Sequence, residues 1–424
     1  MISVSLLFHA NILYAEFSFS RIPFLVENSY IPVIKALETV PGIKAVFNFS
    51  GFTLEVLAGE HPEIYKGNTE VLDLIKKGIA EHRIELAGTS YAHAVLPLLP
   101  LWLQVEDIRL FKSTAERLLG YTPQGFFPPE LGTSPILPDI LSEQGYTWSF
   151  LDRDLVELSG KGFLNEANEF DRFPRVFTKI TAEASKGNPF DAFLFLQSLD
   201  TLLYKQHDYS PLLWQGAGET SLWGFQLETV WITYTLLCLS RNLLFREKHL
   251  LKRIQRTLKK KDMTPYSLFF PYSADVEFYG AGGNTIKRAI PVSRLVSFLQ
   301  HLSVSQSFRC TLPTDLCKNM EADLKEQGNP HIPTSVYVKA GSWSSDKSFE
   351  LWRRDPDNVI LEKISTEAAS AFREKEAGMQ LSTRNRILKD LLLAYNSDGR
   401  GWTPHPEHRR FCYNKARKVL QELS

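Results

Sequence analysis

The sequence has no excess of charge of either sign. Lys plus Arg and Asp plus Glu each number 48 in 424 residues, so the formal net charge is +0. Nucleic acids and anionic membrane surfaces attract proteins that carry an excess of positive charge. The balance therefore argues against nucleic acid as a partner, and we interpret the basic run at 259–261 as a solvated face.

Cysteine is scarce and has no informative spacing. No CxxC pair and no zinc-ligand or disulfide pattern connects the four cysteines, which are Cys238, Cys310, Cys317 and Cys412. Secreted disulfide-stabilised domains use many more cysteines than this. We therefore expect free thiols, a reducing compartment and a cytoplasmic location.

Clustered metal ligands are also missing from the sequence. His9 and His93 are isolated, and no HxxxH-type pair follows the strands that we expect. A metal-dependent hydrolase or deacetylase on a related barrel would need grouped His and Asp ligands. We keep that reaction as an alternative and expect no metal or other cofactor.

Long uninterrupted hydrophobic runs are absent. The most apolar segment, "VWITYTLLCLSRNLLF", contains Arg241 and Asn242 and is too short to span a bilayer. The N-terminal segment "MISVSLLFHANILYAEF" has neither a basic region nor a small-residue cleavage site. We expect a buried helix from the first, an initial strand from the second, and no membrane partner.

The chain does contain a regular alternation of short apolar runs and longer helical patterns, and 44% of its residues are hydrophobic. Strands separated by helices of this length indicate βαβ units and a parallel sheet, here a closed or nearly closed barrel. Strands are expected at 2–9, 44–51, 84–90, 124–130 and 147–152, and helices at 30–40, 70–83, 105–120 and 135–145.

Two domains are expected. The first, 1–302, is the barrel, and the irregular stretch from about 160 to 262 interrupts it as a helical insertion. A polar stretch that begins at Ser303 marks the boundary. The second domain, 303–424, is mostly helical and is expected to pack on the barrel.

Three carboxylates stand where barrel strands are expected to end, which is where barrel enzymes carry their reactive groups. Glu130 follows two prolines in "FFPPELG", and Asp275 and Glu277 share one side of the extended segment "PYSADVEFYG". Two carboxyl groups roughly 5–5.5 Å apart can cleave a glycosidic bond with retention. For each carboxylate, a helix N-cap or a surface charge is the simpler alternative.

Aromatic side chains near these carboxylates fit a site that stacks on sugar faces. The candidates are Trp214, Trp223, Phe278 and Tyr279. Later tryptophans suit either sugar platforms or packing between the domains, and these are Trp343, Trp352 and Trp402.

Five segments resemble, in the family's order, the motifs of glycoside hydrolase family 57. They are "HRIELAGTSYAHAVLPLL", "GFFPPELGTSPILPDILSEQGYTWSFLD", "ADVEFYG", "GSWSSDKSFELWRRDPDN" and "LLLAYNSDGRGWTP". The resemblance implies an incomplete (β/α)7 TIM-like barrel with a C-terminal α-helical domain. It also implies a retaining hydrolase or transglycosylase that acts on α-glucans.

The same resemblance assigns roles to individual residues. Glu130 aligns with the nucleophile of the family and Asp275 with the general acid/base. His9 and His93 align with histidines that hydrogen-bond sugar hydroxyls or support the carboxylates. The full set of expected substrate-binding residues is His9, Asn11, His93, Glu277, Trp223, Trp352 and Asp398.

The chain also departs from the motifs of the family. Asn11 stands in place of the second histidine of the N-terminal motif, and Phe127 stands in place of the usual tryptophan. Leu131 replaces the arginine that follows the nucleophile, and its loss is expected to raise the pKa of Glu130. A catalytically impaired carbohydrate-binding or regulatory protein on the same fold is therefore the alternative function.

Overall fold

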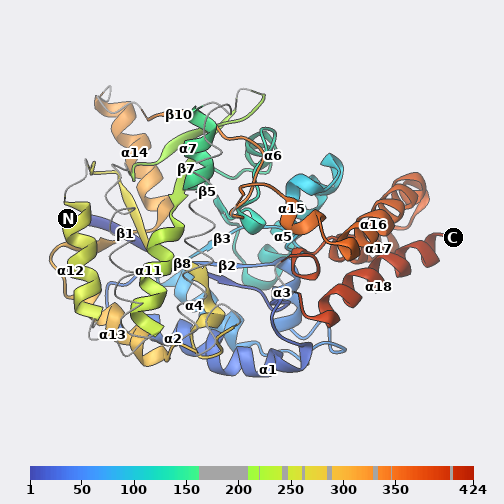
Figure 1. Ribbon diagram of the computed structural model, residues 1–424, viewed down its shortest axis with the longest axis horizontal. Coiled ribbons are helices and arrows are strands. Elements are labelled where there is room, and N and C mark those ends of the chain that lie inside the picture. The colour runs from blue at the N-terminus through green and yellow to red at the C-terminus, as the bar shows by residue number, and fades with distance from the viewer. Residues whose placement is uncertain are drawn as a thin grey trace.

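The computed structural model describes residues 1–161, 209–218, 220–240, 247–259, 263–283, 289–327, 333–344, 346–401 and 404–424 (Figure 1). Much of the expected insertion, residues 162–208, lies outside the described residues, as does Trp402. The expectations for those residues stay predictions.

Two sheets form the wall of the barrel. One has the strand order β3-β2-β1-β8, with β9 also paired to β1, and the other has the order β10-β6-β7-β5-β4. The strands are β1 (Ile2–Ala10), β2 (Ala45–Phe49), β3 (Ile84–Ala87), β4 (Gly125–Phe126), β5 (Trp148–Asp152), β6 (Leu212–Gln215), β7 (Ser221–Leu227), β8 (Leu268–Asp275), β9 (Phe308–Cys310) and β10 (Ser335–Tyr337).

A parallel bridge between Gly88 and Phe126 joins the two sheets. The barrel strands therefore run in the order β8-β1-β2-β3-β4-β5-β7, and the strand pairings along this path are parallel. Among the described strands no ladder pairs β7 with β8, so the wall stays open there. This confirms the expected incomplete barrel.

Helices follow the strands and cover the outside of the barrel, and a C-terminal group of helices lies to one side (Figure 1). The barrel helices include α2 (Ile31–Thr39), α3 (Gly51–Leu57), α4 (Glu70–Ala80), α5 (Leu101–Leu119), α6 (Leu137–Glu143), α7 (Arg153–Lys161), α11 (Thr229–Ser240), α12 (Glu247–Leu258) and α13 (Val292–Ser303). The later helices are α14 (Pro313–Gln327), α15 (Glu350–Arg353), α16 (Pro356–Lys375), α17 (Leu381–Ala394) and α18 (Pro406–Leu423).

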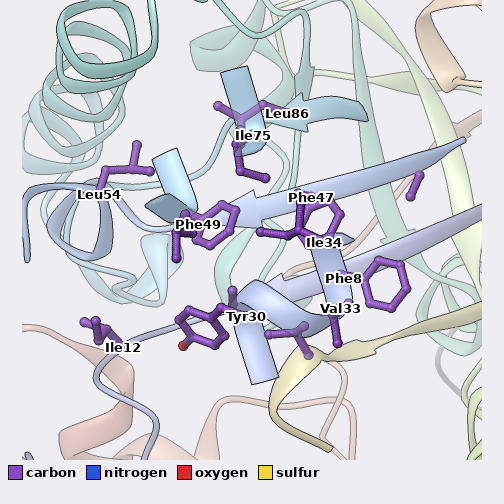
Figure 2. Close-up of a cluster of buried hydrophobic side chains, with 14 of the residues drawn as sticks. Phe8, Ile12, Tyr30, Val33, Ile34, Phe47, Phe49, Leu54, Ile75 and Leu86 are labelled. Carbon is purple, nitrogen blue, oxygen red and sulfur yellow. The ribbon is translucent and has the colours of Figure 1, made fainter. Parts of the chain in front are cut away.

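The period-two alternation of the strands separates an outer core from an inner one. On β1, Phe8 faces the helices and packs with Phe47 of β2 and Val33 of α2 (Figure 2). Leu7 faces the interior and joins a second core. His9 is two residues further along, so the same alternation places it on the inner face, where the strand ends.

The segment after Ser303 contributes to the barrel as well as to the C-terminal helices. Strand β9 pairs with β1, and β10 pairs with β6. Helix α14 places Leu316 and Met320 in the inner core. Strands on both sides of the expected boundary thus build the two sheets, and the division at 303 stays a prediction.

The described part of the apolar segment, up to Ser240, lies in helix α11, and Trp231 and Leu239 of that helix lie in the outer core. Within the described ranges, every helix is too short or too polar to cross a bilayer.

A buried carboxylate joins the barrel to the C-terminal helices. Glu55 of α3 accepts hydrogen bonds from Lys389 of α17 at 2.6 Å, from Arg117 of α5 at 3.0 Å and from Tyr91 at 2.8 Å. Burial alone would raise the pKa of Glu55, but His61, Lys389 and Tyr91 outweigh it and lower the pKa to about 2. The charged form of Glu55 therefore stabilises the packing of α17 on the barrel.

We expect Glu55→Gln to lower the free energy of unfolding by about 2–3 kcal/mol at pH 7. Folding lowers the pKa of Glu55, so its contribution is full above the unfolded value of 4.5 and is lost as pH falls through about 2. Urea unfolding should therefore show a smaller difference from wild type at pH 3 than at pH 7. Glu60→Gln, at the exposed partner of Arg117, is the control and should change less than about 1 kcal/mol. An equal difference at both pH values would contradict the role of the charge.

Candidate active site

The carboxyl ends of the barrel strands bring the candidate residues to one face. Strands β1 and β8 pair in register with His9 opposite Asp275. The segment after β3 carries His93, and the segment after β4 carries Glu130. This arrangement follows from the parallel sheet, because parallel strands end at the same edge.

Glu130 lies in a strained turn after two prolines. Its φ is 57° and the φ of Leu131 is 46°, both in the left-handed region that non-glycine residues seldom adopt. His93, with a φ of 53°, shares this property. Such strain persists only where surrounding contacts impose it, and it often marks functional sites.

The carboxylate of Glu130 accepts two hydrogen bonds from the C-terminal part of the chain. The Trp343 indole nitrogen donates to Oε2 at 2.6 Å, and the Ser397 hydroxyl donates to Oε1 at 2.8 Å. The backbone of Trp343 also donates to the carbonyl of Glu130 at 3.2 Å. Each carboxylate oxygen thus has a fixed partner, which orients the group.

Ser397 also connects Glu130 to His93. Nδ1 of His93 lies 2.9 Å from the Ser397 hydroxyl oxygen and 3.6 Å from Oδ2 of Asp398. The serine has a single proton, which it gives to Glu130, so His93 must donate its own Nδ1 proton to the serine oxygen. The backbone of Ser397 holds the loop in place by donating to the carbonyl of His93 at 3.1 Å.

His93 and Asp398 form a buried pair of opposite charge. Burial would lower the pKa of His93, but Asp398 and then Glu130 outweigh it and raise the pKa. Burial would raise the pKa of Asp398, but His93 outweighs it and lowers the pKa. Protonation of His93 would place beside Glu130 the positive charge that an arginine at position 131 would supply.

His9 is the uncharged member of a stacked histidine pair. Its ring centroid is 4.7 Å from that of His93 and 5.4 Å from that of Phe127. Burial and the nearby His93 lower its pKa to about 3. Nδ1 of His9 is 2.7 Å from Oδ1 of Asn48, and this contact fixes the ring.

The two candidate catalytic carboxylates have different surroundings. Burial raises the pKa of Asp275 to about 7, and the negative charges of Glu16, Glu130 and Asp398 add to the effect. Burial also raises the pKa of Glu130, but His93, Trp343 and Ser397 act in the opposite direction. Burial outweighs these groups, so the pKa of Glu130 stays raised, and Asp275 keeps its proton up to near-neutral pH.

Glu277 and Asn11 lie beneath this face. Glu277 is fully buried, and its Oε1 accepts hydrogen bonds from the Tyr30 hydroxyl and from the backbone of Asn11 at 3.2 Å. Burial and then Asp275 raise its pKa well above the usual value. The side chain of Asn11 is also buried and donates to Asp398. Both side chains support the site from below.

Only some of the side chains of the site reach solvent. Glu130 and Asp275 are half-buried there, and His9, Phe127 and Trp343 accompany them. The two aromatic rings supply the flat apolar surface on which a sugar ring can stack.

Two tryptophans expected from the sequence lie away from this face. Trp223 pairs in register with Trp148 at the start of β5, so it lies at the opposite end of the strands, where its indole donates to Glu321. Trp352 is 2% exposed and packs at 6.2 Å against Trp343, so it backs the site without reaching the surface.

Ser397 and the contact of Trp343 with Glu130 were not foreseen. Both residues lie in segments that resemble the family, but the sequence does not show that these late segments fold back over β4. Asp398, the neighbour of Ser397, was expected and lies within the network. The only sequence signal for a role of Ser397 is its position next to Asp398, which is an expected site residue.

Among the residues that the structure describes, no group of His, Cys, Asp or Glu could hold a metal ion.

Part of the chain matches a known protein family. The model of the glycosyl hydrolase family 57 matches residues 8–185, which include His9, His93 and Glu130. The matched residues, which make up less than half of the chain, are similar to glycosyl hydrolase family 57. The match covers the part of the barrel that carries the candidate nucleophile, while Asp275 and the C-terminal donors lie beyond it.

Relatives within family 57 are distant in sequence. A 4-alpha-glucanotransferase from Thermococcus kodakarensis is 28% identical over 126 residues, 30% of this chain and 18% of that protein. The alignment thus spans less than a fifth of the length of that relative.

Solved structures support the family fold over the whole chain. The 4-alpha-glucanotransferase of Thermococcus litoralis matches with a TM-score of 0.68 and 16% identity, over 100% of this chain and 60% of that one. A GH57 branching enzyme from Thermococcus kodakaraensis matches with a TM-score of 0.69 and 12% identity, over 99% and 89%. At such identities the likeness describes the fold.

We expect Glu130→Gln to lower the pKa of Asp275 below about 7, because the substitution removes a neighbouring negative charge. Carbon-13 NMR of protein labelled at the aspartate carboxyl carbon measures this pKa, and Asp275→Asn assigns the signal. Glu63→Gln, at an exposed carboxylate, is the control and should leave the pKa unchanged. An unaltered pKa in Glu130→Gln would mean that the two carboxylates do not interact.

Proposed function

We propose that the protein is a retaining glycoside hydrolase or glucanotransferase that acts on α-linked glucose polymers or oligosaccharides. One observation carries the proposal: two carboxylates lie on one strand-end face, and only one of them, Glu130, has side-chain donors that act against the effect of burial. Donors from Trp343 and Ser397 hold Glu130, while burial and then neighbouring negative charge raise the pKa of Asp275 to about 7. A retaining glycosidase needs this pair of one nucleophile and one acid.

In the proposed reaction Glu130 attacks the anomeric carbon of the sugar, and Asp275 gives its proton to the departing glycosidic oxygen. A covalent glycosyl-enzyme forms as the bond to the leaving sugar breaks. The ionised Asp275 then removes a proton from the incoming acceptor hydroxyl, whose oxygen displaces Glu130 from the anomeric carbon. The strained turn and its two donors hold Glu130 in place for the attack.

The acceptor decides between hydrolysis and transfer. Water gives a hydrolase, and a hydroxyl of a second glucan gives a transferase. Proteins similar to this chain are described as 4-alpha-glucanotransferases, GH57 branching enzymes and an α-amylase, so both outcomes occur on this fold. Product analysis with maltoheptaose separates them, because hydrolysis releases new reducing ends and transfer gives longer chains.

We expect Glu130→Gln to lower kcat by at least about 10⁴-fold with maltooligosaccharides or amylose, because removal of a triad-type nucleophile costs that order in other hydrolases. Glu63→Gln provides the matched surface control. Chromatography of the products over long incubations measures the residual activity. Equal activity in Glu130→Gln and wild type would rule out the nucleophile assignment.

We expect the pH dependence of kcat/KM to be bell-shaped. Activity should fall above pH of about 7 as Asp275 loses its proton, and should fall on the acid side as Glu130 gains one. Because the pKa of Glu130 is raised, the fall in activity on the acid side should occur at a higher pH than it would for an ordinary glutamate. Stopped assays across the pH range measure both sides, and a flat profile from pH 6 to 9 would contradict the role of Asp275.

A second candidate function is a carbohydrate-binding or regulatory protein that has lost turnover. Its support is the raised pKa of Glu130 together with leucine at position 131. Glucan binding by calorimetry, without any product at high protein concentration, would favour this function over the enzyme.

A further inference from the structure

A loop from the C-terminal part of the chain, here named the Trp343 loop and made of residues 341–344 and 346–348, contacts the turn that carries Glu130. Gly341 and Thr133 exchange backbone hydrogen bonds of 2.8 and 3.1 Å. The backbone and the indole of Trp343 both donate to Glu130. The indole reaches the carboxylate only while the loop is held against the barrel.

One lysine fixes this loop to the barrel. Nζ of Lys347 lies 2.9 Å from Oδ1 and 3.1 Å from Oδ2 of Asp152, and 3.4 Å from Asp154. It also donates to the backbone carbonyl of Trp343 at 3.4 Å. An ammonium has three protons, and the two carboxylates and the carbonyl accept all of them.

The barrel side of this ion pair is rigid. Asp152 is the last residue of β5 on the inner face of the sheet, and its Oδ1 accepts the backbone proton of Leu155 at 2.8 Å in the first turn of α7. The side chains of Lys347 and Asp152 are 3% and 1% exposed. The contact thus links the loop to a strand and a helix rather than to another loop.

The arrangement is unfavourable for stability alone. Lys347 has a left-handed backbone with a φ of 57°, and its charge lies in the interior. A buried ion pair is often no more stabilising than well-packed apolar residues, and strain of this kind accompanies functional sites. The strained backbone and the buried charge both occur at Lys347, whose loop carries the indole that donates to Glu130.

We propose that Lys347 is a positioning residue: its ion pair with Asp152 holds the Trp343 loop so that the indole of Trp343 donates to Glu130. This inference rests on the proposed function for its effect on turnover, because it takes Glu130 as the nucleophile. Leu131, the residue after Glu130, has no side-chain group that could donate to the carboxylate. The Trp343 loop supplies one of the two side-chain donors that Glu130 has. Lys347 acts through Trp343 and makes no contact with Glu130 itself.

Lys347→Met tests the proposal, because it keeps the length of the side chain and removes the charge. We expect kcat to fall about 100-fold, in line with the cost of a small misplacement of a catalytic group. The acid side of the kcat/KM profile should move to higher pH, because Glu130 loses a donor that lowers its pKa. Lys347→Arg should recover part of the activity, and Asp152→Asn should repeat the effect from the other partner.

The control variant is Lys389→Met, which breaks another lysine–carboxylate pair, with Glu55, away from Glu130. It should lower thermal stability without moving the pH profile. A loss of kcat in Lys389→Met equal to that in Lys347→Met would show a general effect of instability and would overturn the proposal.

A second readout does not depend on activity. Protein labelled with 5-fluorotryptophan gives a fluorine NMR signal for Trp343, which Trp343→Phe identifies among the eight tryptophans. We expect this signal to move in Lys347→Met and in Asp152→Asn. An unmoved signal would overturn the proposal whatever the activity. A moved signal in a protein whose wild type turns over no glucan would support the positioning role and reject the proposed function.

Discussion

The hydrogen bond from Ser397 to Glu130 joins residues 267 positions apart and unites the two parts of the molecule at the site. A buried carboxylate needs partners if it is to stay ionised. The barrel alone provides a strained turn for Glu130, but its carboxylate donors come from the C-terminal segments. The position of those segments over the strand ends is therefore a condition for the proposed chemistry, and the ion pair of Lys347 with Asp152 helps to hold the Trp343 loop there.

The parts of the fold that could be predicted from the sequence depend on local patterns. The alternation of strands and helices predicted the barrel, and the expected helix at 30–40 is α2 within a residue at each end. The expected strand at 124–130 is only β4, Gly125–Phe126, because Pro128 and Pro129 lack the backbone protons that a longer ladder requires. The prolines limited the strand and produced the turn.

The parts of the site that could not be predicted depend on contacts between distant segments. Asp275, His9 and His93 were expected at strand ends, and parallel pairing places them there. Trp343 and Ser397 lie in loops whose paths depend on the packing of the C-terminal helices. Trp223 is expected in the site because tryptophan can stack on sugars, but its register in β7 places it at the end of the sheet away from Glu130.

The Ser397 contact also has a consequence for the order in which the molecule is made. During synthesis the barrel strands that carry His93 and Glu130 leave the ribosome long before Trp343 and Ser397 exist. Until then the carboxylate of Glu130 has neither donor, and the turn that carries it lacks its backbone hydrogen bonds with Gly341 and Trp343. In a nascent barrel of this chain the candidate nucleophile is thus present without its two donors, and the complete candidate site forms only after the C-terminal segments have been made.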